Sequence, residues 1–260
     1  MDDAATSQPI HQMMADMLGL PLFRTDLHLP DYPVGEIGPW RVTRCPLHTG
    51  RGYWGQSYVV ADMPALLRRH GDRWETWMSM APYELQSQEL GCRYAYGHTV
   101  VMGLGMGWIA INAALNPTVE KVTVIERDPY VIALVKESGV LERAPVEAGR
   151  KIAVVQADAL EWTPTEKVDF LYADIWLHIA EPQALEEVQR MQANLRAEAI
   201  YFWGQELVIR EQAALLAPDA LLDQVLLERV IRERICLPLA IPERGSYLEL
   251  VHQALSLKTS

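Results

Sequence analysis

The sequence predicts an α/β protein whose core is a doubly wound, mostly parallel sheet, preceded by a β-hairpin and helical appendage. From about residue 98 to residue 207, short apolar runs alternate with helix-length segments. Right-handed crossovers force such an order into a parallel sheet that is covered on both faces. Half of the 260 residues are hydrophobic and 22% are charged, so the chain has enough apolar side chains for a full core.

Residues 1–35 are expected to form an N-terminal helix and a linker. The stretch 10–18 is amphipathic and carries three methionines. A methionine stripe at helical spacing is typical of packing material, and a groove for a partner is the alternative. The stretch 29–35 contains two prolines and a glycine, which indicates a linker.

Residues 36–97 are expected to form a small α+β cap unit. Alternating stretches at 40–44 and 53–60 flank a glycine turn, which predicts a β-hairpin. Asp62 followed by Pro64 is typical of a helix start, so we expect a helix running through Leu67. A strand is then expected at 75–80 and a helix at 83–90, which leads into the first core strand.

Residues 98–260 are expected to form the main domain. The apolar runs predict strands at 99–102, 122–125, 152–155, 170–173 and 200–203. The segments between them predict helices at 108–115, 129–137 and 182–194. A further amphipathic helix is expected at 221–233. Segments 235–241 and 247–257 fit either a closing strand pair or a strand followed by a helix.

Composition narrows the class of protein. The formal charge of −11 and the pI near 5.1 argue against a nucleic-acid surface, which needs clustered Lys and Arg. Three scattered cysteines give neither a disulfide framework nor a metal cluster and fit a reducing compartment. The acidic start and the lack of an 18-residue apolar run predict neither a signal peptide nor a membrane span. We therefore expect a cytoplasmic protein with a small-molecule substrate and no membrane partner, and a homodimer stays open.

A glycine turn after the first core strand is the most informative motif. Gly103, Gly105 and Gly107 let the chain turn sharply and let a ligand approach bare backbone. The unit strand–glycine turn–helix–strand ends on Glu126, an arrangement typical of a site for an adenosine-bearing ligand. A dinucleotide fingerprint would need glycine at position 108, where Trp108 would crowd a pyrophosphate. Adenosine with a short amino-acid tail fits better, and a purely structural turn is the alternative.

Acidic residues end the next two core strands. Glu126 can accept hydrogen bonds from both ribose hydroxyls at once. The alternative for Glu126 is a cap on the helix at Pro129, for which Asp128 is the better candidate. Asp158 can accept from an adenine amino group while the Ala159 N–H donates to a ring nitrogen. The alternative for Asp158 is the N-cap of a short turn.

The fourth strand ends in a third group of polar and aromatic residues. Asp174 is expected to line the ligand crevice, where it could hold an ammonium group or orient a substrate nucleophile as a catalytic residue. Trp176 could stack on adenine, on the substrate or on a sulfonium cation, or it could be ordinary core. His178 is either a general base or a structural histidine.

Four successive motifs carry a family resemblance across residues 98–207. They are Val101-Met-Gly-Leu-Gly-Met-Gly, Val124-Ile-Glu-Arg-Asp-Pro, Gln156-Ala-Asp-Ala and Asp169-Phe-Leu-Tyr-Ala-Asp. As a set they resemble the cofactor motifs of class I S-adenosylmethionine-dependent methyltransferases. The resemblance implies a Rossmann-like methyltransferase fold with a seven-stranded sheet and S-adenosylmethionine as cofactor. It implies no metal.

The resemblance also assigns roles by position. The glycines would approach the methionine moiety, Glu126 the ribose and Asp158 the adenine, and Asp174 would lie near the reacting centre. The implied cofactor-binding set is Gly103, Leu104, Gly105, Gly107, Glu126, Arg127, Asp158, Ala159, Asp174 and Trp176. Residues 36–97 would cap the sheet edge and select the substrate, with Tyr53, Trp54, Tyr83 and Gln86 as candidate contacts.

Within that family, Tyr83-Glu-Leu-Gln-Ser-Gln88 and the Glu-Arg-Asp-Pro motif are similar to the spermidine synthase family of aminopropyltransferases. That family has acids where this chain has Met106 and the run Ile175–Leu177. A polyamine needs carboxylates for its ammonium groups, so this difference suggests a changed substrate. We expect methyl transfer to an unidentified small molecule. The alternatives are aminopropyl transfer, a non-catalytic S-adenosylmethionine-binding protein and, disfavoured by Trp108, a nicotinamide enzyme.

Overall fold

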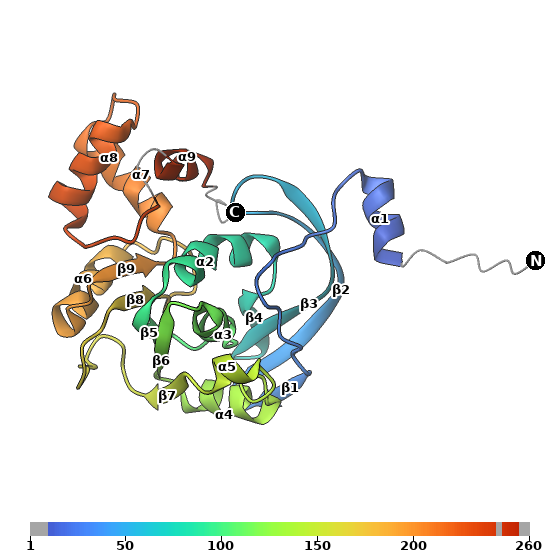
Figure 1. The fold of residues 1–260 in the computed structure, drawn as a ribbon. Helices are drawn as coiled ribbons and strands as arrows, with labels where there is room; N and C mark the ends of the chain where they lie inside the picture. The colour runs from blue at the N-terminus through green and yellow to red at the C-terminus, as the bar shows by residue number, and fades with distance from the viewer. Residues whose placement is uncertain (1–9, 243–245, 255–260) are drawn as a thin grey trace, which may run out of the picture.

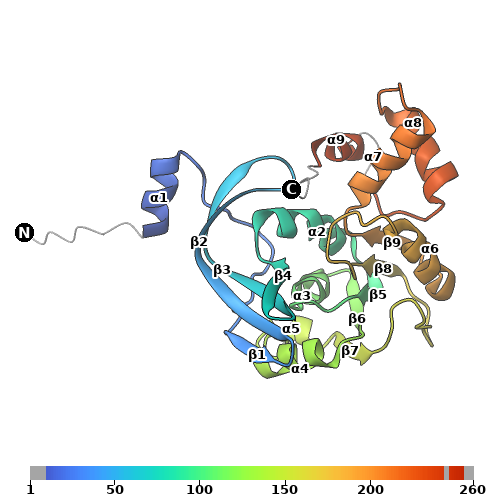
Figure 2. The ribbon, with the colours of Figure 1, turned by 180° about the vertical axis from the view of Figure 1, so that it is seen from behind.

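The computed structural model describes residues 10–242 and 246–254 (Figure 1). It contains two sheets, an antiparallel one in the order β1-β2-β3-β4 and a parallel one in the order β7-β6-β5-β8-β9. Helices α2 and α3 lie on the face of the parallel sheet toward the antiparallel sheet, and α6 lies on the opposite face (Figures 1 and 2). The predicted fold class is confirmed.

The parallel sheet forms where the apolar runs predicted it. Its strands are β5 (Gly97–Met102), β6 (Val119–Glu126), β7 (Ile152–Gln156), β8 (Phe170–Ala173) and β9 (Ala199–Phe202). Strand β5 pairs with both β6 and β8, so the strand order reverses beside it. The crevice at the carboxyl ends of such strands is the usual ligand site of an open α/β sheet.

The helices pack through apolar side chains, and a side chain caps the N-terminus of some of them. They are α1 (Ile10–Leu18), α2 (Pro82–Tyr94), α3 (Trp108–Leu115), α4 (Pro129–Ser138), α5 (Val146–Gly149), α6 (Ala184–Leu195), α7 (Gln205–Leu216), α8 (Gln224–Val230), the π-helix η1 (Ile231–Ile235) and α9 (Ser246–Gln253). The sequence did not predict α5 or α7. Helix α8 begins at Gln224 because the Asp223 side chain caps it. No helix in the described ranges is long and apolar enough to cross a membrane.

The antiparallel sheet corrects one prediction. Its strands are β1 (Gly35–Ile37), β2 (Trp40–Arg51), β3 (Ser57–His70) and β4 (Arg73–Ser79). The hairpin is confirmed, but the helix expected from Asp62 through Leu67 is wrong, because those residues lie inside β3. Pairing with β2 and burial of Ala65 and Leu66 outweigh the local Asp-x-Pro signal. Asp62 keeps a left-handed φ of 51° and pairs with Arg44.

The C-terminal part departs from the seven-stranded sheet that the resemblance implies. Within the described residues the parallel sheet has five strands, and Leu239 adds only an isolated bridge to Ile200. Pro238 and Pro242 cannot donate to a strand ladder, which limits pairing there. Residues 246–253 are helical, so the strand-pair alternative is wrong for them; residues 255–257 lie outside the described ranges.

Helix α1 forms as predicted but packs less than expected. Its Ala15 is buried, whereas Met13 and Met17 are 51% and 79% exposed. The helix stands beside β2 and β3 at the edge of the molecule (Figure 1). The expectation that its methionines are packing material is wrong for these two residues.

Candidate functional site

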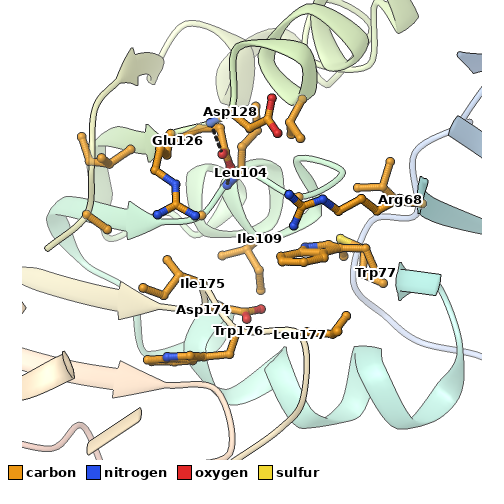
Figure 3. Close-up of a pocket in the computed structure, with 18 of the residues that line it drawn as sticks. Arg68, Trp77, Leu104, Ile109, Glu126, Asp128, Asp174, Ile175, Trp176 and Leu177 are labelled. Carbon is orange, nitrogen blue, oxygen red and sulfur yellow. Dashed lines mark hydrogen bonds between the residues drawn. The ribbon is translucent and has the colours of Figure 1, made fainter. Parts of the chain in front are cut away.

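A cavity of about 720 Å³ lies at the carboxyl ends of β5, β6 and β8. Sites for small molecules and cofactors commonly measure roughly 300–1,000 Å³. One wall is formed by the loops that follow the core strands, and the other by side chains from the antiparallel sheet and α2, including Trp40, Arg68, Trp77, Glu84 and Gln88. Figure 3 shows side chains from both walls directed into the cavity.

Nine of the ten residues in the implied cofactor set line this cavity: Gly103, Leu104, Gly105, Glu126, Arg127, Asp158, Ala159, Asp174 and Trp176. Gly107 is not among the lining residues. It caps α3 with a φ of 78°, and a Cβ there would lie 3.2 Å from Leu141. A glycine is needed at position 107 for the positive φ of the turn and for the close approach of Leu141. The implied contact of Gly107 with a ligand is not supported.

The glycine turn has no room for side chains at two positions. A Cβ on Gly103 (φ 98°) would collide with the carbonyl oxygen of Asp174, and one on Gly105 (φ 50°) would lie 2.6 Å from Met78 Sδ. The Asp174 N–H also donates to the Met102 carbonyl at 2.9 Å. The turn is therefore tied to the end of β8 on one side and touches β4 on the other.

Glu126 is held against this turn. Its Oε2 accepts a hydrogen bond from the Leu104 N–H at 3.0 Å, and its Oε1 accepts from the Asp128 N–H at 2.7 Å; Figure 3 shows the carboxylate beside Leu104. Each carboxylate oxygen can accept more than one bond, so acceptor capacity remains for a ligand. The alternative role as helix cap is taken by Asp128, whose Oδ1 accepts from the Tyr130 N–H.

Asp128 also joins the two sheets. Its second oxygen accepts a hydrogen bond of 2.8 Å from Trp40 Nε1, and Trp40 is the first residue of β2. The N-cap of α4 and the start of β2 are thus fixed to each other, and both residues line the cavity.

Asp158 caps a short turn, which is the alternative role that the sequence suggested for it. Its Oδ1 accepts from the Leu160 N–H at 2.9 Å. Its Oδ2 lies 3.7 Å from Arg127 Nη1, whose side chain is 80% exposed. The capping bond uses only one of the two oxygens, and Asp158 lines the cavity, so a cap and a ligand contact are compatible.

The deep end of the cavity holds two carboxyl groups joined by an amide. Gln88 Nε2 donates to Asp174 Oδ2 at 3.2 Å and to Glu84 Oε1 at 3.1 Å. Removal from water raises the pKa of Asp174 from its ordinary 3.8 to about 8. Desolvation, and after it the charge of Asp174, raises the pKa of Glu84 well above its usual range. Near neutral pH this pair therefore holds at least one proton.

Sequence reasoning missed Glu84 and Gln88 as site residues. They are four positions apart on α2, a spacing that places two side chains on one helix face. That spacing was visible, but nothing in the sequence indicated that this face turns toward Asp174.

Buried polar atoms without partners line the same cavity. Within the described residues, Gln88 Oε1, Tyr172 OH and Trp108 Nε1 have no hydrogen-bond partner. Buried polar groups are nearly always hydrogen-bonded, so these atoms indicate where a ligand or ordered water would bind. Two of the three, the amide oxygen and the hydroxyl, can accept a hydrogen bond from a ligand donor.

Other predicted contacts have different surroundings. The Trp176 indole is 6% exposed, lines the cavity and donates to Glu187. His178 is exposed and is not a lining residue, so nothing supports it as a general base. Tyr53, Trp54, Tyr83 and Gln86 are likewise not among the lining residues. Tyr53 instead donates to the buried Glu206.

No family model and no curated protein matches the chain. Among solved structures, a dimethyladenosine transferase from Plasmodium falciparum is 19% identical (TM-score 0.33) over 48% of this chain and 42% of its own. A glycopeptide N-methyltransferase complexed with S-adenosyl-L-methionine is 18% identical (TM-score 0.30) over 38% and 41%. A precorrin-6y C5,15-methyltransferase from Geobacter metallireducens is 17% identical (TM-score 0.34) over 45% and 58%.

The matches thus span about half the length of those solved chains. All three are named as transferases or methyltransferases, and a likeness at this level of identity concerns the fold alone. Any assignment of a ligand therefore depends on the cavity itself.

Proposed function

We propose that this chain binds S-adenosylmethionine in the cavity and transfers its methyl group to a small molecule. The observation that carries the proposal is the meeting of the bare Gly103–Gly105 turn, Glu126 and Asp158 at the strand ends, around a cavity of cofactor size. The sequence motifs point to this same set of residues. When bound, S-adenosylmethionine supplies an activated methyl group on a sulfonium, so the protein has mainly to align an acceptor and exclude water.

The residues present fit this cofactor. Gly103 and Gly105 leave main chain exposed where an amino-acid tail would lie. Glu126 is already oriented by Leu104, which lowers the entropic cost of a ribose contact. Asp158 and the Ala159 N–H stand at the adjacent strand end, where they can contact an adenine ring.

Asp174, Glu84 and Gln88 are then suited to the acceptor. Their free acceptor atoms face the deep end of the cavity, where a nucleophile carrying a proton, such as an amine or hydroxyl, could donate to Asp174. A pKa of about 8 leaves a fraction of Asp174 ionised near neutral pH, and the ionised carboxylate can accept that proton. We propose that Asp174 orients the acceptor in this way.

A second candidate, aminopropyl transfer as in the spermidine synthase family, is favoured by one observation. The acids missing at position 106 and in 175–177 are compensated in part by Glu84, which lies beside Asp174 through Gln88. Two carboxyl groups can bind an ammonium group of a polyamine. The two candidates differ in the cofactor, because aminopropyl transfer needs the decarboxylated form.

Isothermal titration calorimetry of the purified protein with S-adenosylmethionine and S-adenosylhomocysteine tests the proposal. We expect both to bind, and we expect mass spectrometry to find one of them in protein purified under native conditions. If neither compound binds, the proposal is wrong. If both bind but no metabolite mixture yields S-adenosylhomocysteine, the non-catalytic alternative replaces the methyltransferase.

A further inference from the structure

One cation in the cavity has no partner for its charge. Arg68 lies on β3 directly opposite Trp40 on β2, and its side chain lines the cavity. Its guanidinium carbon is 5.4 Å from the centre of the Trp40 ring and 5.5 Å from that of Trp77. Figure 3 shows Arg68 and Trp77 side by side, both directed inward. Within the described residues it makes no ion pair and no hydrogen bond.

Other arginines of the chain differ from it. Arg41 pairs with Glu36, and Arg44 pairs with Asp31 and Asp62, so these guanidinium groups are neutralised. Arg127, the other arginine that lines the cavity, lies near Asp158. A guanidinium carries five N–H donors and stays charged at any physiological pH. At Arg68 all five remain free for a ligand.

The position of Arg68 indicates which part of a ligand it would meet. Gly105 approaches Met78 so closely that a Cβ would lie 2.6 Å from the sulfur, and Met78 follows Trp77 on β4. The glycine turn therefore abuts the strand segment on which Arg68 stacks. Ile175 and Trp176 lie at the opposite side of the cavity from Arg68 and Trp77 (Figure 3).

We propose that Arg68 binds the α-carboxylate of S-adenosylmethionine and makes the site select this cofactor over its decarboxylated form. The inference rests on the proposed function: with ribose at Glu126 and adenine at Asp158, the amino-acid tail runs along the glycine turn toward Arg68. An Arg–carboxylate pair is a strong, directional contact, and the faces of Trp40 and Trp77 hold the guanidinium in place. The decarboxylated compound lacks the carboxylate that would pair with the guanidinium of Arg68.

Calorimetry with S-adenosylmethionine, S-adenosylhomocysteine and decarboxylated S-adenosylmethionine tests the proposal on the wild type, Arg68→Gln and Arg69→Gln. Arg69 is the matched control, because it is the next residue on β3, stacks on Trp74 at 5.8 Å and does not line the cavity. We expect the wild type and Arg69→Gln to bind the two carboxylate-bearing compounds about 10- to 100-fold more tightly than the decarboxylated one. Arg68→Gln should lose that preference while its affinity for the decarboxylated compound stays the same.

The outcomes separate this inference from the function on which it rests. If none of the three compounds binds the wild type, the proposed function itself is wrong. If all bind the wild type equally, or if Arg68→Gln weakens all three alike, only the role of Arg68 is wrong. The same group could instead bind a carboxylate of the acceptor, in which case Arg68→Gln would raise the KM of the acceptor and leave cofactor affinity unchanged, and the proposal would be overturned. Circular dichroism checks that each variant is folded.

Discussion

Glu126 shows how one carboxylate can organise a site and still bind a ligand. Its two oxygens accept from backbone N–H groups on both sides of the strand end, so removing it loosens the glycine turn and deletes the ribose contact together. Glu126→Ala should weaken binding of S-adenosylmethionine by roughly 2–3 kcal/mol, the range for hydrogen bonds to a charged group. Calorimetry measures this, with the exposed Glu120→Ala on the same strand as control. Unchanged affinity in Glu126→Ala would show that the carboxylate makes no ligand contact.

Asp174 gives a prediction for pH dependence. Burial raises its pKa to about 8 in the folded protein, whereas the unfolded chain titrates near 4. A raised pKa contributes stability below the unfolded value, and that contribution is lost as pH rises toward 8. Asp174→Asn, which cannot ionise, should therefore gain stability relative to the wild type by about 1 kcal/mol per pH unit between pH 4 and 8. Urea unfolding across that range measures the difference; a gap that stays constant with pH would contradict the assignment.

At the scale of elements, the turn between β5 and α3 can be tested by filling it. Gly105→Val places a Cβ against Met78 and forces a β-branched residue into a left-handed φ, where such side chains are strained. We expect binding of S-adenosylmethionine to be lost while far-UV circular dichroism stays near native.

The control for that experiment is Gly71→Val. Gly71 also has a positive φ, 59°, but open space around its would-be Cβ, and it is not a cavity residue. This variant carries similar backbone strain without filling the site, so it should bind normally. If Gly105→Val binds S-adenosylmethionine as tightly as the wild type does, the turn is not part of the binding site.

The sequence predicted the elements that are marked by local patterns, such as apolar runs and helix caps. It did not predict the conformation of residues that is decided by pairing with a neighbouring strand. Strands β5, β6, β8 and β9 are mostly buried because helices cover them, so they read as continuous hydrophobic runs. Asp128 and Pro129 begin α4 as an ordinary capping pair. The residues 62–67 carry the same kind of capping signal, yet they extend β3, because the neighbouring strands decide their conformation.

At the scale of the whole molecule, four distant segments meet at one buried carboxyl group. Glu206 on α7 accepts hydrogen bonds from the hydroxyls of Tyr53, Tyr201 and Tyr247. These tyrosines come from the β2–β3 connection, β9 and α9. Desolvation raises the pKa of Glu206 although the tyrosine bonds oppose it. The contact therefore joins the cap, the parallel sheet and the C-terminal helix.

Removing this carboxyl group should affect stability without touching the cavity. Glu206→Ala leaves the buried hydroxyls of Tyr53 and Tyr247 without their acceptor, whereas Tyr201 keeps the Ser87 carbonyl at 3.2 Å. We therefore expect a loss of about 1–3 kcal/mol in unfolding free energy for the unsatisfied groups, plus the cost of the space left. Urea denaturation at pH 7 measures it. Glu211→Ala, at an exposed position on α7, is the control. If Glu206→Ala is as stable as the wild type, the cluster does not stabilise the contact between these segments.

The candidate site was predictable only on its strand-edge side. Gly103, Glu126, Asp158 and Asp174 follow directly from core strands, so topology alone brings them to one edge. Glu84, Gln88 and Arg68 enter the cavity because the cap folds over that edge, and this depends on contacts between residues far apart in the chain, such as Trp40 with Asp128.

This division of the cavity wall has an evolutionary consequence. The half that faces the adenosyl group is fixed by the ends of the parallel strands, where a change would disturb the core. The half that faces the methionine tail and the acceptor consists of side chains on β3, β4 and α2, whose backbones are held by the hydrogen bonds of their own sheet or helix. Mutations there can change which molecule is modified at little cost to folding, so diversification among descendants of this chain should concentrate on that wall.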